Sequence, residues 1–262
     1  MMGVVIPCAV LSPALHEALQ SASGTPVIVV DDSIGQDLQL EGVQVVRTGG
    51  KRGFATAANM GLAEMEHRGI KCVLVLNDDA VLHPGAFQEL EQAWAKTDGA
   101  LAPVLHEPGG PVYGIQVGSW GRVRLARSGG PVEALSGAAI MFRASERFDP
   151  AYVHGFEDVE LCHRLRQRGL RVRCIQTAHC DHMAGATISR RSREAQRHAV
   201  SGHLRYLHGG VRGVFAVVLA LLQVIRERGP LDRLQGIKEG VGDYLRADPQ
   251  PPHQPPPTAS LR

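Results

Sequence analysis

The amino-acid sequence predicts an α/β protein with a mixed, mainly parallel sheet flanked by helices, and three observations support this fold class. Short, continuous apolar runs recur along the first part of the 262-residue chain and are typical of strands buried on both faces. Stretches with helical spacing lie between them, as the crossovers between parallel strands require. Two of the runs, VIVVDD and VLVLNDD, end on acidic residues. Parallel strands bring their carboxyl ends to one edge of a sheet, where ligands bind.

The first hundred residues alternate between the two kinds of element. Pro13 suits the first position of a helix, and Gly24 and Gly69 suit the residue after a helix ends. The apolar runs predict strands at 4–6, 27–30, 43–46 and 73–76, and helical spacing predicts helices at 13–22, 54–67 and about 84–95.

The pattern is weaker over residues 99–135, which are rich in Gly and Pro. Their strand patterns, VYGIQV and GRVRLA, are broken, so irregular strands and loops over the sheet are expected. Regular elements are expected again at 138–142, in a helix over about 157–168, and in the alternating strand LRVRCI. Beyond residue 190 the composition predicts a helical extension over 191–246 and a disordered, proline-rich tail over 247–262.

Composition excludes several classes of protein. The formal charge is only +2, which argues against a nucleic-acid binder. Five widely spread cysteines with no CxxC pair indicate a reducing compartment. The N-terminus lacks the pattern of a secretory signal, and the apolar run over 214–225 is too short to span a bilayer. A cytoplasmic protein is therefore expected, with contact to the inner face of the membrane left open.

Acidic residues follow two of the predicted strands. Asp31 and Asp32 end one, and Asn77, Asp78 and Asp79 end the other. Such a rim suits a divalent cation, ribose hydroxyls or the edge of a base. The preference of Asp and Asn for turns and helix caps explains either pair alone equally well. Both together favour a functional site.

Two further stretches suit the same site. The basic, glycine-rich loop GGKRG at 49–53 leads into a helix and could meet phosphate oxygens, although it is not a Walker motif and a surface loop is the simpler reading. In the helix beginning near Glu157, Asp158 shares one face with Leu161, Cys162 and Leu165. A carboxylate on that face could act as a general base, whereas an acid in a first turn also stabilises the helix dipole.

The stretch TAHCDH is predicted to lie just past a strand. A zinc site with Cys174 and Cys180 is one reading, but the spacing matches no structural zinc pattern. A single imidazole that joins carboxylates around one cation is more economical.

Seven stretches in this order resemble family 2 glycosyltransferases of the GT-A fold, most closely the bacterial rhamnosyltransferase-like branch. The resemblance covers roughly residues 3–190, and its motifs are VVIPC, VIVVDDS, RGFATAANMG, VLVLNDDAVLHPGAF, LSGAAIMFR, FDPAYVHGFEDVELCHRLRQRGLRV and HMAGAT. It implies a Rossmann-like catalytic domain over 1–190, with a nucleotide-binding half at about 1–98 and an acceptor-binding half at about 99–190.

The resemblance also implies roles for the matching residues. Asp79 would bind Mg²⁺ or Mn²⁺ on the donor diphosphate, and His182 would complete the metal site. Asp158, beside Glu157, would be the catalytic base of an inverting transfer. The residues expected to face the nucleotide are Pro7, Cys8, Asp31, Asp32, Arg52, Gly53, Phe54, Asn59, Asn77 and Asp78. Asn77 stands where the family often has an Asp, and Arg52 where it often has an Asn.

The resemblance implies transfer of a sugar from a UDP- or dTDP-linked donor to a glycan, lipid-linked or small-molecule acceptor. A sugar-1-phosphate nucleotidyltransferase is one alternative, but no Gly-rich phosphate loop follows the first strand. A non-catalytic, membrane-peripheral scaffold is another, through residues 190–226. Packing of that segment on the catalytic domain as a helical hairpin is favoured, because Gly209, Gly210 and Gly213 interrupt its amphipathic pattern. A homodimer is also left open.

Overall fold

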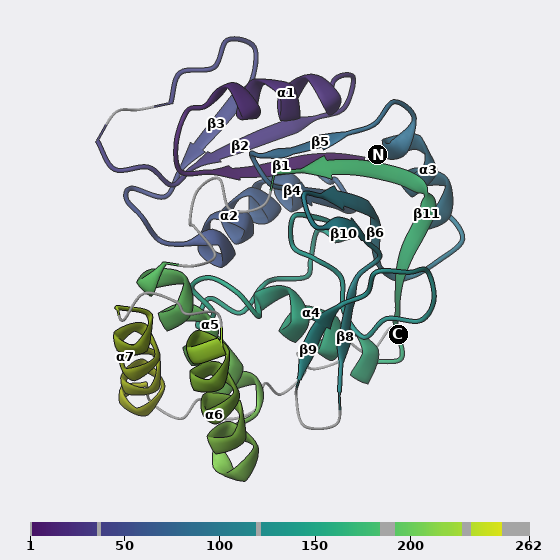
Figure 1. The fold of residues 1–262 in the computed structure, drawn as a ribbon. Coiled ribbons are helices and arrows are strands. Elements are labelled where there is room, and N and C mark those ends of the chain that lie inside the picture. The colour runs from purple at the N-terminus through teal and green to yellow at the C-terminus, as the bar shows by residue number, and fades with distance from the viewer. Residues whose placement is uncertain (1, 36–37, 119–121, 184–191, 227–231, 248–262) are drawn as a thin grey trace, which may run out of the picture.

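A computed structural model of the chain describes residues 2–35, 38–118, 122–183, 192–226 and 232–247. Its centre is a mixed nine-stranded sheet with the strand order β3-β2-β1-β4-β10-β6-β11-β5, and β7 pairs with β6 (Figure 1). The strands of this sheet are β1 (Met2–Cys8), β2 (Val27–Asp31), β3 (Gln44–Arg47), β4 (Cys72–Leu76), β5 (Ala80–Leu82), β6 (Gly99–Glu107), β7 (Gly110–Val112), β10 (Ala139–Arg143) and β11 (Arg171–His182). A separate hairpin joins β8 (Ile115–Val117) to β9 (Val123–Leu125).

The N-terminal half of the sheet is parallel, as the sequence predicts. β1 pairs in parallel with both β2 and β4, and β3 extends this block in parallel. β10 then runs antiparallel between β4 and β6, and β11 runs parallel to β6. The carboxyl ends of β1, β2 and β4 therefore share one rim.

Helices cover both faces of the sheet, and each face has its own apolar core. The first four helices are α1 (Pro13–Ser21), α2 (Phe54–His67), α3 (Ala86–Trp94) and α4 (Glu157–Gln167). Side chains of β1 alternate between the faces, because successive residues of a strand point to opposite sides. Val5 packs with α2 and α4, whereas Val4 and Ile6 pack with α1 and α3.

Residues 99–107 correct one expectation, because they form a long central strand rather than loops. Seven consecutive residues of β6 are buried, so no alternation marks it, and Pro103 argues against a central strand in the sequence. The neighbouring strand accommodates the proline: the register of β11 against β6 shifts between Ile175, which faces Pro103, and His179, which faces Val104. A second correction follows, because β11 continues through His182 and the TAHCDH stretch lies within the strand.

The C-terminal part forms three helices: α5 (Arg193–Tyr206), α6 (Gly210–Arg226) and α7 (Asp232–Arg246). The first two occupy the segment for which the sequence predicts a helical hairpin, and they contact each other. Val200, Leu204, Val224 and Ile237 form a small core among them. Within the described residues, no helix is long and apolar enough to cross a membrane. The expected boundary at 190–191 and residues 248–262 of the expected tail lie outside the described residues.

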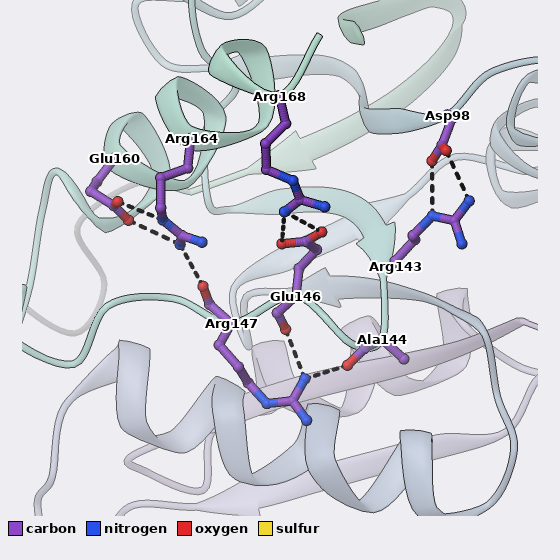
Figure 2. A network of polar contacts seen from close by, with 8 residues as sticks. All are labelled: Asp98, Arg143, Ala144, Glu146, Arg147, Glu160, Arg164 and Arg168. Atoms are coloured by element: carbon purple, nitrogen blue, oxygen red, sulfur yellow. Dashed lines mark hydrogen bonds and ion pairs between the residues drawn. The ribbon is translucent and has the colours of Figure 1, made fainter. Parts of the chain in front are cut away.

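A polar network attaches α4 to the segment after β10 (Figure 2). Arg164 binds Glu160 with its Nε 2.6 Å from Oε1, as the i, i+4 spacing predicts, and also donates to the carbonyl oxygen of Arg147. Arg168 pairs with Glu146 at 2.8 Å. Arg147 in turn reaches Glu66 of α2, with 2.5 Å between Nη2 and Oε2. The helix that begins with Glu157 is thus fixed against α2.

Close packing of α2 on the sheet predicts a large effect of Gly61→Ala. A Cβ at Gly61 would lie 2.4 Å from Val5 Cγ1 and 2.9 Å from Val30 Cγ2, and neither β-branched side chain can move away easily. Overpacking of this kind costs about 1–3 kcal/mol, which exceeds the ~1 kcal/mol that Ala gains over Gly in a helix. We expect a lower free energy of unfolding in urea for Gly61→Ala.

Gly242→Ala is the matched control, since Gly242 lies in α7 and its Cβ would meet only the flexible end of Arg246 at 3.1 Å. This variant should be neutral or slightly stabilised. Equal stability of the two variants would contradict the packing described for α2.

Candidate active site

A pocket of about 400 Å³ opens at the carboxyl ends of β1, β2 and β4. Many of the residues predicted from the sequence line it: Pro7, Cys8, Asp32, Gly53, Phe54, Asn77, Asp78, Asp79 and His182. These residues come from five separate parts of the chain, and the parallel arrangement of the strands brings them together.

Lys51 of the basic loop at 49–53, which the sequence analysis singles out, also lines the pocket. Other residues of the pocket were not predicted: Val153 and His154 come from a loop, and Glu194 and His198 come from α5. The rings of His154 and His198 are 6.4 Å apart, and burial lowers the pKa of both imidazoles. No motif marks α5 as part of this site, because its Arg- and His-rich sequence resembles that of any exposed helix.

The two acids that follow β2 have different partners. Asp31 accepts hydrogen bonds from the backbone N–H of Ser33 and of Leu38, both at 3.0 Å, and does not line the pocket. Burial by itself raises the pKa of Asp31, but these hydrogen bonds and the nearby Arg47 outweigh it and lower the pKa. Asp31 therefore stabilises the turn after β2.

Asp32 shapes one wall of the pocket through the loop at 48–53. Its carboxylate accepts hydrogen bonds from Arg52 N at 2.7 Å, Gly53 N at 2.9 Å and Thr48 Oγ1 at 2.7 Å. Gly53 has a positive φ of 88°, and a Cβ there would lie 2.8 Å from the carbonyl oxygen of Val153. Only glycine allows this approach, which brings the loop against the segment before α4.

Two residues expected at the nucleotide have other roles in the structure. Arg52 contributes its backbone N–H to Asp32, and its side chain does not line the pocket. Asn59 makes two hydrogen bonds of 2.8 Å with the backbone N–H and C=O of Phe148, which attaches α2 to the segment after β10.

The carboxyl end of β4 carries the acids that the sequence singles out. Burial, together with the charge of Asp79, raises the pKa of Asp78 to about 6, and a hydrogen bond involving Cys8 acts in the opposite direction. In the protein without a ligand, the carboxylate of Asp79 therefore repels that of Asp78 and disfavours its ionisation.

Asp79 and His182 lie side by side although 103 residues separate them in the chain. Antiparallel pairing places His182 of β11 opposite Ala80 of β5, and His182 Nε2 lies 3.3 Å from Asp79 Oδ1. Both residues are buried, with 6% and 7% of their surface exposed.

Glu107, at the end of β6, is the third member of this arrangement and was not predicted. Its Oε1 lies 3.1 Å from His182 Nδ1, so the imidazole lies between two carboxylates. Burial by itself lowers the pKa of His182, but the hydrogen bonds and charges of Asp79 and Glu107 outweigh it and raise the pKa to about 9. The sequence gives no hint of Glu107, because it belongs to the strand that the Gly- and Pro-rich composition conceals.

The donor set of Asp79 and His182 fits a Mg²⁺ or Mn²⁺ ion that a substrate diphosphate would help to bind. Such ions are commonly bound by one or two protein carboxylates together with substrate phosphates, and a ligating histidine commonly has its other ring nitrogen hydrogen-bonded to a carboxylate. In the ranges that the structure describes, no group of three His, Cys, Asp or Glu residues is arranged to hold a metal by itself. This applies also to a zinc site with Cys174 and Cys180.

Glu157 and Asp158 begin α4, and their burial differs from expectation. Glu157, not Asp158, leads the buried face, because it stands four and eight residues before the buried Leu161 and Leu165. Glu157 is 7% exposed, and its Oε2 has no hydrogen-bond partner among the described residues.

Asp158 is half-buried and hydrogen-bonded. It accepts from Gly137 N at 2.9 Å and from Val159 N at 2.8 Å. A Cβ at Gly137 would lie 3.6 Å both from Asp158 Cβ and from the ring of Phe54, which lines the pocket. Burial raises the pKa of both acids, and the charge of Asp158 adds to the effect on Glu157.

The raised pKa of Asp78 predicts a pH-dependent stability. A carboxyl group whose pKa is higher in the folded state loses stability as pH rises from its unfolded pKa near 4 to its folded pKa near 6. Asp78→Asn should match the original protein below pH 4 and exceed its free energy of unfolding by roughly 1–3 kcal/mol above pH 6. Urea unfolding across this range, with a chelator present, measures the difference. A difference that does not change with pH would contradict the assignment.

Comparisons with known proteins agree with this fold. Residues 4–119 match the family model described as Glycosyl transferase family 2. A crystal structure of GalNAc-T7 with UDP, GalNAc and Mn²⁺ is similar at a TM-score of 0.60 and 11% identity, covering 79% of this chain and 47% of that one. The structure of S. aureus TarS 1-349 is similar at 0.53 and 13% identity, covering 93% and 70%.

The likeness to the solved structures is one of fold, since identities are low, and the chain spans about half the length of GalNAc-T7. No curated protein sequence matches the chain. The family match covers the strands and loops that build most of the pocket. Residues 4–119, a little under half of the chain, are therefore similar to family 2 glycosyltransferases, and the solved structures share the fold of the chain.

Proposed function

We propose that this protein is an inverting, metal-dependent glycosyltransferase that moves a sugar from a UDP- or dTDP-linked donor to an acceptor hydroxyl. The observation that carries the proposal is the convergence of Asp79, His182 and the pocket at the strand ends, beside the acid-bearing start of α4. The motif likeness to the rhamnosyltransferase-like branch supports a donor of this kind. The GalNAc-T7 structure, which binds UDP and Mn²⁺, adds support for the same chemistry.

The nucleotide would occupy the part of the pocket between β1 and α2. Cys8, Asp32 and Phe54 supply an apolar surface and an acceptor for ribose or base groups there. Asp78 is well placed for a ribose hydroxyl, and a hydroxyl donor would relieve the cost of ionising a carboxyl whose pKa is raised to about 6. Lys51, on the same wall, can reach phosphate oxygens.

Asp79 and His182 would bind the metal ion, and Glu107 would orient the imidazole. A hydrogen bond at Nδ1 fixes the ring so that Nε2 faces Asp79 and the pocket. When bound, the ion neutralises charge that develops on the leaving diphosphate.

Asp158 is the proposed general base. Two backbone N–H donors hold its carboxylate in one orientation, and burial raises its pKa, which makes it a stronger base than an exposed aspartate. It would remove the proton from the acceptor hydroxyl as that oxygen attacks the anomeric carbon opposite the diphosphate, with inversion. Glu157 is deeply buried beside it, and burial together with the charge of Asp158 raises the pKa of Glu157.

The two alternative functions are less well supported. A sugar-1-phosphate nucleotidyltransferase would need a phosphate loop after the first strand, and Ala9 to Ser12 offers none. A non-catalytic scaffold would not require the carboxylate–histidine–carboxylate arrangement of Asp79, His182 and Glu107.

The assignment of the base predicts the effect of Asp158→Asn. This variant should lose at least about a thousandfold in transfer rate while keeping its donor affinity, because only proton removal is affected. Transfer is measured by nucleotide release with a screened donor and acceptor, and donor binding by calorimetry. Glu160→Gln is the matched control: it makes the same chemical change two residues along α4, where Glu160 pairs with Arg164. Full activity of Asp158→Asn, with loss in Glu157→Gln instead, would assign the base to Glu157.

The metal assignment predicts two graded effects on Mn²⁺ binding in the presence of a nucleoside diphosphate. Asp79→Ala should abolish it, because a ligand is removed. Glu107→Gln should weaken it by about 10- to 100-fold, because the imidazole loses the carboxylate that orients it. Electron paramagnetic resonance of free Mn²⁺ gives the affinities without any need for turnover. The assignment is wrong if Asp79→Ala binds Mn²⁺ as the original protein does.

A further inference from the structure

Helix α6 presents an apolar stripe that the described part of the chain leaves uncovered. Its members recur at spacings of three and four residues, so they lie on one side of the helix. They are Val211, Val214, Val218, Leu221, Leu222 and Ile225, with exposed fractions from 36% to 76%. The opposite side, with Gly213, Ala216 and Val224, is buried against the other C-terminal helices. Figure 1 places α6 at the lower edge of the molecule, away from the sheet.

Arginines border this stripe, and the described helix α6 contributes no acid to it. Arg212 and Arg226 belong to α6, which contains no Asp or Glu. Arg122 and Arg124, next to and within β9, line the same groove as Leu222 and Arg226. All four side chains are exposed, and none is ion-paired with a carboxylate in the ranges described. An apolar strip with a uniformly basic border is complementary to an anionic lipid surface.

The arginines of α5 serve a different purpose. Arg193 pairs with Glu239 of α7, and Arg197 pairs with Asp243 at 2.5 Å. The basic segment singled out in the sequence is therefore largely neutralised by α7, and the available positive charge lies around α6.

Other occupants of the stripe fit less well. Residues 248–262 contain Leu261 as their only large apolar side chain, so they cannot replace water over six positions. A second copy of the chain would bring two sets of arginines together, with no carboxylate of the described α6 between them, and like charges at an interface oppose association. The described helix is not long enough to cross a membrane, because its 17 residues extend only about 25 Å.

We propose that the exposed stripe of α6 docks the protein onto a membrane surface that contains anionic phospholipids, with the helix lying in the interface. The six apolar side chains enter the boundary between headgroups and acyl chains, and Arg122, Arg124, Arg212 and Arg226 contact the phosphates. Docking does not depend on the donor or on the metal. It does bring the candidate active site close to the lipid, because α5 contacts α6 through Leu204 and lines the pocket through His198.

Sedimentation of the full chain with lipid vesicles tests this docking. Binding is expected to vesicles of phosphatidylglycerol and phosphatidylcholine, at least about tenfold tighter than to phosphatidylcholine alone, and weaker at high salt. Val214→Asp/Val218→Asp should reduce binding at least about tenfold, since two charges would enter the apolar boundary. Arg212→Gln/Arg226→Gln should weaken it by about fivefold for each arginine.

Two matched controls separate docking from general effects. Leu245→Asp changes an apolar residue that is 73% exposed on the neighbouring helix α7, and Arg171→Gln removes an exposed arginine on β11. Both should bind vesicles as the original protein does. Circular dichroism and melting temperature show that each variant is folded.

Two results would overturn the proposal. One is vesicle binding that Val214→Asp/Val218→Asp leaves unchanged although the variant is folded. The other is a dimer in sedimentation velocity that this variant dissociates, with no vesicle binding by the original protein, which would assign the stripe to a second copy.

Discussion

The position of β1 between β2 and β4 is the constraint on which the site depends. Parallel pairing sets Cys8 level with Asp31 and Val5 level with Val75, so the three chains emerge at one rim. Hydrogen bonds of the ladder and burial on both faces hold this register, because a slip of one residue would exchange the side chains that fill the two apolar cores. Asp32 after β2 and Asp78 and Asp79 after β4 therefore reach the same pocket.

The acids at this rim differ because their local partners differ. Asp31 and Asp32 are satisfied by backbone N–H donors, and they stabilise the turn and the loop around the pocket. Asp78 has fewer such donors, and burial raises its pKa. Asp79 faces an imidazole that Glu107 holds from the other side. Carboxylates that are not fully satisfied by hydrogen-bond donors or positive groups of the protein are suited to bind a ligand with hydroxyls or positive charge.

The C-terminal helices connect this rim to a second surface. α5 contributes Glu194 and His198 to the pocket and Val200 and Leu204 to the core beneath α6. Ion pairs with α7 hold α5 in place, and six apolar side chains on one side of α6 are exposed. A single helix thus separates the site of the proposed chemistry from the proposed lipid-facing surface.

The sequence by itself determined the parallel N-terminal block and the acids at its rim. Continuous apolar runs such as VLVL and glycines after helices such as Gly69 act locally, so they can be recognised without knowing the rest of the fold. The helix over 54–67 and the pairing of Glu160 with Arg164 follow from the same local rules.

Only the tertiary structure decided how distant segments meet. Strand β6 is buried on both faces and contains Pro103, so nothing in its sequence marks it as a strand, and Glu107 at its end could not be recognised beside His182. The helix begins at Glu157, as the sequence predicts, but the deeper burial of Glu157 than of Asp158 depends on what packs against α4. The ion pairs of α5 and the small core that α5 shares with α6 both involve residues of α7. Burial and charge pairing are properties of neighbours in space, and spacing along the chain specifies those neighbours only within one element.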